Sequence, residues 1–154
     1  MSDSPPSDLA DIRGWQRLAP DVTTSGKLDP GDPARLGAIG VRHVINLALD
    51  DHPEALADER ALLAAQGIAY THIPVPFAAP GDNHYAAFKS ALADQPGPVH
   101  VHCIMNYRVS AFFYRLHREA GMDEAEARAL MAQQWDPLAS DRPEAKPWAD
   151  LIAS

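Results

Sequence analysis

The residues best suited to chemistry lie in one short stretch, residues 99–110, which holds the only cysteine of this 154-residue chain. An apolar, β-branched run ends at Cys103, a short loop follows, and Arg108 stands where a clearly helical segment begins. A cysteine attacks as the thiolate, which the free amides and positive dipole of a helix N-terminus stabilise. An arginine adds a planar donor fork that grips an oxyanion at two oxygens. The stretch therefore predicts an anion pocket around a nucleophilic sulfur.

The residues around the cysteine have distinct expected roles. Backbone amides that converge form a nest for phosphate or sulfate, and such a nest usually needs one residue at positive φ, which asparagine tolerates. Ser110 is expected to donate to the sulfur or its neighbours, and His102 to brace the loop backbone rather than act as a base. The predicted substrate-binding residues of the loop are Ile104, Met105, Asn106 and Tyr107.

A lone cysteine is most often a buried small hydrophobe, and an arginine near a helix start is common. Here, however, a strand end, a loop with an asparagine, an arginine, a serine and a helix occur together. This combination favours a functional Cys103.

Bulk composition narrows the setting. An apolar fraction of 46% over this length suits one domain with a real core. The net charge of -8 argues against nucleic-acid binding and requires a local positive field for an anionic substrate. A single cysteine excludes an internal disulfide and suits the reducing cytoplasm. No secretory signal and no membrane-spanning stretch is recognisable, so we expect a cytoplasmic protein that binds neither membrane nor nucleic acid.

Short apolar runs alternate with amphipathic segments along the chain. Strands are expected at 21–26, 43–47, 69–73 and 98–102, and helices at 32–39, 53–66, 83–93, from about 108, and at 123–134, with a last helical turn near 148–152. This alternation predicts an α/β fold, with a mainly parallel central sheet flanked by helices. Residues 1–14 are expected to form a flexible tail and residues 15–154 one domain. Ligands of such sheets bind beyond the carboxyl ends of the strands, where Cys103 lies.

The chain resembles the bacterial branch of the cysteine-dependent tyrosine and dual-specificity phosphatase superfamily. The resemblance spans residues 24–148 and is carried by 24–26, 44–47, Glu59, 67–70, 73–75 and the His102-Cys103 pair with Asn106, Arg108, Val109 and Ser110. It implies a phosphatase-like fold and a two-step hydrolysis of phosphomonoesters. Cys103 would form a cysteinyl phosphate, Arg108 and the loop amides would hold the phosphoryl oxygens, and water would release phosphate. The resemblance implies no metal and no cofactor, and a phosphorylated protein or small molecule as substrate.

The loop departs from this superfamily in its length. Five residues usually separate the cysteine from the arginine, whereas four lie between Cys103 and Arg108. Either the ring is one residue short and lacks one amide donor, or Val109 stands where the arginine normally does. Ser110 keeps the usual distance from the cysteine, which favours the second register.

The general acid is the second departure. The superfamily usually places an aspartate after the third strand, where this chain has Phe77. Asp82 is the candidate acid, although it is better explained as the N-cap of the next helix. Asp136 is a weaker candidate. Without an acid, we expect turnover only of substrates with good leaving groups, such as phenols.

Two other functions stay open. Four residues between cysteine and arginine is also the loop length of rhodanese-like sulfurtransferases, which carry a persulfide. A phosphatase-like module that binds phosphorylated ligands without turnover would also fit the missing acid. A weak phosphatase is favoured, because the upstream segments resemble phosphatases. The physiological substrate and the oligomeric state are left open by the sequence.

Overall fold

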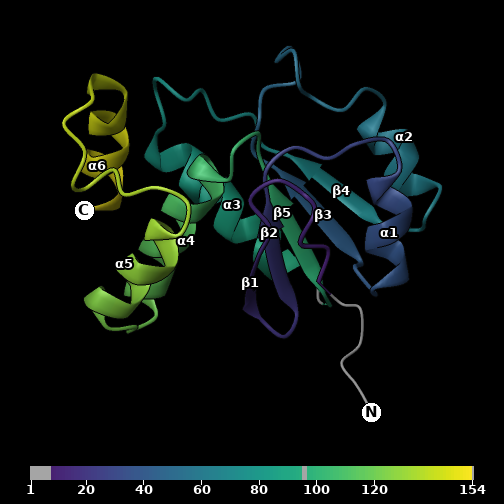
Figure 1. Ribbon diagram of the computed structural model, residues 1–154, viewed down its shortest axis with the longest axis horizontal. Helices are drawn as coiled ribbons and strands as arrows, with labels where there is room; N and C mark the ends of the chain where they lie inside the picture. The colour runs from purple at the N-terminus through teal and green to yellow at the C-terminus, as the bar shows by residue number, and fades with distance from the viewer. Residues whose placement is uncertain (1–7, 95–96, 154) are drawn as a thin grey trace.

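A five-stranded sheet lies at the centre of the computed structural model, which describes residues 8–94 and 97–153 (Figure 1). Its strands run in the order β1-β2-β5-β3-β4. They are β1 (Gln16–Ala19), β2 (Val22–Ser25), β3 (His43–Asn46), β4 (Ala69–His72) and β5 (Val99–His102). Only β1 pairs antiparallel within these residues, and the other strand pairs are parallel. The predicted α/β fold with a mainly parallel sheet is therefore confirmed.

Helices cover both faces of the sheet (Figure 1). One face carries α1 (Asp32–Ala38) and α2 (Glu59–Ala64), and the other carries α3 (Asp82–Asp94), α4 (Tyr107–Glu119), α5 (Glu124–Ala132), a short 3-10 turn (Pro143–Ala145) and α6 (Lys146–Ile152). Within residues 8–94 and 97–153, no helix combines the length and the apolar character that crossing a bilayer requires.

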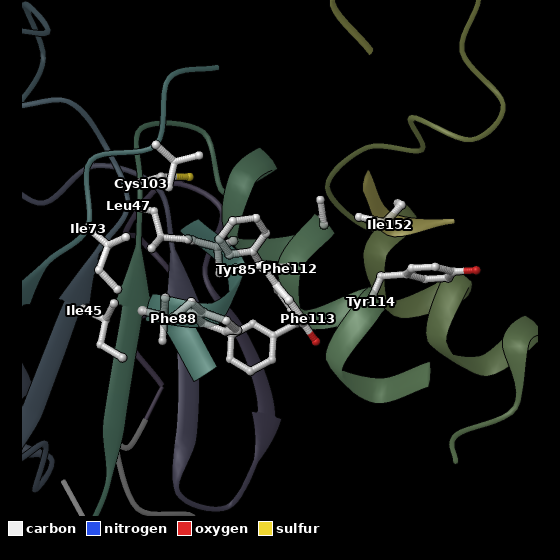
Figure 2. Packing of buried hydrophobic residues seen from close by; sticks show 14 of the residues in the cluster. Ile45, Leu47, Ile73, Tyr85, Phe88, Cys103, Phe112, Phe113, Tyr114 and Ile152 are labelled. Atoms are coloured by element: carbon white, nitrogen blue, oxygen red, sulfur yellow. The ribbon is translucent and has the colours of Figure 1, made fainter. Parts of the chain in front are cut away.

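Each face of the sheet has its own apolar cluster, because side chains alternate along a strand. Val44 belongs to the smaller cluster beneath α1 and α2, and its neighbour Ile45 belongs to the larger one. Figure 2 shows part of the larger cluster, in which Phe88 and Phe112 are fully buried. This cluster also contains Cys103, so the candidate nucleophile stands at the border between core and loop.

Three segments differ from the sequence-based expectation. Strand β1 was not predicted, because four edge-strand residues carry little hydrophobic pattern. The helix expected at 53–66 begins only at Glu59, since Asp58 adopts a left-handed conformation with φ 59° that interrupts it. Leu9 and Ile12 are buried in the smaller cluster, so this part of the expected tail packs on the domain. Residues 1–7 of that tail lie outside the described residues.

Candidate active site

The loop between β5 and α4 follows the central strand of the sheet. Asn106 is the residue before α4 and has φ 68°, which confirms the expected positive φ. Its side chain is buried and its amide donates to the Gly14 carbonyl at 2.7 Å and to Thr24 Oγ1 at 3.1 Å. These bonds anchor the start of α4 to the β1–β2 hairpin.

The loop backbone has a second anchor at Ile104. Its carbonyl accepts hydrogen bonds from the Lys27 amide at 2.9 Å and from Arg13 Nη1 at 3.4 Å. A Cβ on Gly26 would lie 2.4 Å from this oxygen, so only glycine allows the approach. Among the described residues, the backbone amides of residues 104–107 have no hydrogen-bond partner. They are thus available to an anion.

A cavity of about 610 Å³ opens beside the loop. It combines aromatic and apolar side chains with charges of both signs, and its lining residues are His52, Phe77, Ile104, Met105, Tyr107, Arg108, Trp135, Asp136, Ser140, Arg142, Glu144 and Ala145. Because the chain is acidic overall, its arginines are the groups that would attract an anion here.

Arg108 is almost entirely buried, with 8% of its surface exposed. Its Nε donates to the Val75 carbonyl at 2.8 Å, and its guanidinium carbon lies 5.4 Å from the centre of the Phe77 ring. Within the described part of the chain, neither Nη atom of Arg108 has a hydrogen-bond partner. The side chain is therefore held by one nitrogen while two donors stay free in a residue that lines the cavity.

The placement of the next two residues bears on the loop register. Val109 is fully buried in the larger apolar cluster, and Ser110 donates to the Tyr107 carbonyl at 3.2 Å. Ser110 lines a different, small cavity, together with Gln16 and Thr24. Of these helix residues, Arg108 is the one at the large cavity, as expected for a ring that is one residue short.

Cys103 is fully buried and is not among the residues that line the large cavity. Figure 2 shows it with the apolar side chains of the larger cluster. Ile104, Met105 and Tyr107 do line the cavity. The structure therefore places Arg108 and most residues of the loop at the cavity, whereas the sulfur of Cys103 is buried and does not line it.

The two histidines of β5 are buried behind the loop. His102 Nε2 lies 2.5 Å from Glu59 Oε2, and His102 Nδ1 lies 3.2 Å from the carbonyl oxygen of Cys103. His100 lies between Thr23 Oγ1 at 2.9 Å and Ser25 Oγ at 2.8 Å. Burial, and secondarily the neighbouring His102, lowers the pKa of His100 well below its ordinary value. His100 is thus a neutral core residue, and His102 contacts the loop backbone as expected.

Asp82 does not line the cavity, where an acid that protonates the leaving group would be needed. It is the first residue of α3, it is exposed, and its carboxylate pairs with Arg115 Nη1 at 2.8 Å outside the cavity. Asp136 does line the cavity. One of its oxygens accepts from Arg128 Nε at 3.0 Å, and the other from the Leu138 amide at 3.1 Å.

Sequence reasoning did not predict that Trp135 lines the cavity with Tyr107. The Trp135 ring stacks on that of Tyr107, with centroids 4.8 Å apart and planes 7° from parallel, and Trp135 Nε1 donates to the Tyr107 carbonyl at 2.9 Å. His52 and Arg142, from two loops far apart in the sequence, and Glu144, from the 3-10 turn, also line the cavity. A tryptophan beside an aspartate and a proline in a polar segment was the one available signal.

One family model matches most of the chain. Residues 14–129 match the model of the phosphatase-like domain of beta-lactamase hydrolase-like proteins. A candidate phosphatase from Shewanella putrefaciens CN-32 is similar in structure, with 30% identity over 94% of each chain and a TM-score of 0.78. No curated protein sequence matches the chain.

Two more distant solved structures share the fold. One is P. aeruginosa TpbA in complex with pTyr, which is 19% identical over 90% of this chain and 82% of that chain, with a TM-score of 0.68. The other is the core catalytic domain of the S. cerevisiae PP-IP phosphatase SIW14 in complex with citrate, which is 12% identical over 91% of this chain and 86% of that chain, with a TM-score of 0.70.

Proposed function

Since the chain belongs to the phosphatase-like domain family of beta-lactamase hydrolase-like proteins, we propose that it hydrolyses phosphomonoesters through a cysteinyl-phosphate intermediate at Cys103. Phosphoric monoester hydrolase is the class of enzyme that this family and the similar structures support. The proposal adds the nucleophile, the anion-binding groups and the acid that protonates the leaving group.

One observation carries the proposal: Arg108 lines the cavity with two donors that no described residue engages. A guanidinium buried without a counter-ion is costly, and an oxyanion at the cavity would supply the missing charge. The unengaged amides of residues 104–107 add donors on the same loop. A doubly charged phosphoryl group matches this set of donors better than a neutral ligand does.

The reaction follows from these placements in two displacements. In the first, the Cys103 thiolate attacks phosphorus, the bond from phosphorus to the ester oxygen breaks, and the alkoxide or phenoxide leaves. In the second, water attacks phosphorus, the sulfur–phosphorus bond breaks, and inorganic phosphate leaves with the thiolate restored. Arg108 and the loop amides stabilise the charge on the oxygens in both steps. Because the sulfur is covered in this structure, the loop must move before attack.

Trapping the intermediate tests the proposal. Purified protein mixed with an excess of an aryl phosphate and quenched with denaturant within milliseconds should carry one phosphoryl group. Since the chain has a single cysteine, peptide mass spectrometry assigns a thiophosphate to Cys103 without ambiguity. Phosphate release with no label on Cys103, and unaffected by its alkylation, would contradict the proposal. Thiocyanate formed from thiosulfate and cyanide would instead indicate a sulfurtransferase.

The leaving-group acid is tested by a matched pair of variants. We propose that Asp136, which lines the cavity, protonates the leaving oxygen, and that Asp82 does not. Asp136→Asn should lower kcat for an alkyl phosphate by about a hundredfold, whereas a nitrophenyl phosphate should be affected little, because its leaving group needs no proton. Asp82→Asn should leave both rates unchanged. Equal losses on both substrates for Asp136→Asn, or a selective loss for Asp82→Asn, would refute the assignment.

A second candidate function is supported by the burial of Cys103. A phosphorylated ligand could bind at Arg108 while the sulfur stays covered, which would make the chain a binding module without turnover. In that case calorimetry would detect binding of an aryl phosphate, and neither phosphate release nor a phosphorylated cysteine would appear.

A further inference from the structure

A buried carboxylate–imidazole pair lies behind the loop and outside the cavity. Glu59, the first residue of α2, and His102, the last residue of β5, approach to 2.5 Å between Oε2 and Nε2. Their side chains are only 5% and 4% exposed, respectively. Neither residue is among those that line the large cavity, so direct contact with a substrate does not explain the pair.

The second nitrogen of the same ring connects the pair to the nucleophile. His102 Nδ1 lies 3.2 Å from the carbonyl oxygen of Cys103. A carbonyl oxygen can only accept a hydrogen bond, and so can an ionised carboxylate. A ring that donated to both would carry a hydrogen on each nitrogen, as an imidazolium does. Its positive charge would lie one residue from the thiol that must ionise.

The carboxylate of Glu59 is itself fixed on its other oxygen. Asn46 Nδ2 donates to Glu59 Oε1 at 3.3 Å and lies 3.1 Å from the Tyr70 hydroxyl, while Asn46 Oδ1 accepts from the Ala48 amide at 2.9 Å. Both oxygens of a buried carboxylate are thus satisfied, as an ionised group away from water requires. This arrangement holds Glu59 in one position relative to the ring.

We infer that Glu59 is a positioning residue, which keeps the His102 ring oriented toward the Cys103 carbonyl and keeps its positive charge beside the nucleophile. The effect on turnover rests on the proposed function, whereas the orientation and charge of the ring do not. Glu59 acts through His102 and is not expected to touch the substrate.

The other titratable groups near the pair do not supply this charge. Burial, together with the charge of Glu59, raises the pKa of Tyr70 to about 12, so Tyr70 is neutral. His100, whose ring centroid is 6.3 Å from that of His102, is kept neutral by its lowered pKa. Arg60 lies over the Tyr70 ring, and the His72 ring stacks on it. The negative charge of Asp50 contributes to the raised pKa of Tyr70. Glu59 is therefore the carboxylate that directly contacts His102.

Ionisation of the single thiol gives a direct test on the full chain, with no requirement for turnover. The ultraviolet absorbance of the thiolate is followed against pH, and the curve of the matching Cys103→Ser protein is subtracted. For Glu59→Gln we expect the thiolate fraction at pH 7 to fall by about tenfold, because the ring loses the partner that keeps it charged. If the substitution acted only by removing the negative charge of Glu59, it would favour ionisation of the thiol and increase the thiolate fraction. An unchanged or increased fraction would therefore overturn the inference.

Glu54→Gln is the matched control. Glu54 is exposed and pairs with Arg13 Nη2 at 3.0 Å, and Arg13 also reaches the Ile104 carbonyl of the loop. Removing this carboxylate should leave the thiolate fraction within twofold of the original value. A change as large as that of Glu59→Gln would point to general electrostatics and count against the positioning role.

A second measurement on the unmodified protein covers the case in which Glu59→Gln fails to fold. Nuclear magnetic resonance of ¹⁵N-labelled imidazole rings should show both nitrogens of His102 protonated at pH 7, and a neutral His102 ring would overturn the inference. Absence of phosphatase activity alongside a charged ring would contradict the proposed function and leave the positioning role intact.

Discussion

Replacing Cys103 by serine is expected to lower kcat for an aryl phosphate by at least about four orders of magnitude, to the background rate. A hydroxyl has nearly the size of a thiol but ionises far less readily, so the nucleophile would be lost while the loop keeps its shape. The measurement is the initial rate of phosphate release at substrate saturation. Among all single substitutions in this chain, this one should have the largest effect on turnover.

Two controls make that result interpretable. Cys103 is fully buried in the apolar cluster, so a serine hydroxyl there costs about 1–3 kcal/mol of folding free energy, and thermal unfolding must show that the variant is folded at the assay temperature. Calorimetry should show that it still binds the aryl phosphate, because Arg108 is intact. A folded variant with the original rate would eliminate Cys103 as nucleophile. Cys103→Ala, which adds no hydroxyl to the cluster, should give the same loss.

Replacing Arg108 by alanine is expected to lower kcat/KM for the same substrate by about a thousandfold. The substitution removes a residue that lines the cavity, with two donors that no described residue engages, and a positive charge in a chain that is acidic overall. Arg108→Lys should recover only part of the loss, since an ammonium group cannot bond two phosphoryl oxygens in one plane and also reach the Val75 carbonyl. Steady-state kinetics at several ionic strengths would measure both variants.

Arg115 offers a matched control for this substitution. It lies on the same helix, α4, and is also largely buried, but it pairs with Asp82 and Glu119 away from the cavity. Arg115→Ala should therefore leave kcat/KM within about twofold, because only a nearby charge of the helix is lost. If the two alanine variants lost activity equally, the loss would reflect damage to α4 and not the removal of an anion-binding group.

Most of the fold could be predicted from local patterns. The four parallel strands could be predicted from short segments with valine, isoleucine or threonine, because β-branched residues favour extended backbone. Asn106 could be assigned a positive φ from its residue type and position alone, since few residues other than glycine tolerate that conformation at a loop–helix junction. The short spacing between Cys103 and Arg108, with four intervening residues where the superfamily usually has five, was also visible in the sequence. These features depend on residues close together in the chain.

What the sequence left undetermined depends on contacts between distant residues. No local pattern shows that Tyr107 stacks on Trp135, or that Arg115 rather than the cavity engages Asp82. The burial of Cys103 is a further example, because a cysteine after an apolar strand suits a core residue and a nucleophile equally well. The register of the loop also stayed ambiguous, because the position of the Ser110 side chain, which donates to the Tyr107 carbonyl and lines the small cavity, depends on the fold of the loop.

The close approach between Gly26 and the carbonyl of Ile104 limits how the sulfur can be uncovered. That peptide is pinned to the end of β2 by the Lys27 amide and by the absence of a side chain at residue 26. The first residue of the turn, Ile104, is consequently held in place, whereas the next residue, Met105, is 44% exposed. Exposure of the Cys103 sulfur would then require movement of the loop after Ile104, while Ile104 itself stays bound to the chain segment that follows β2.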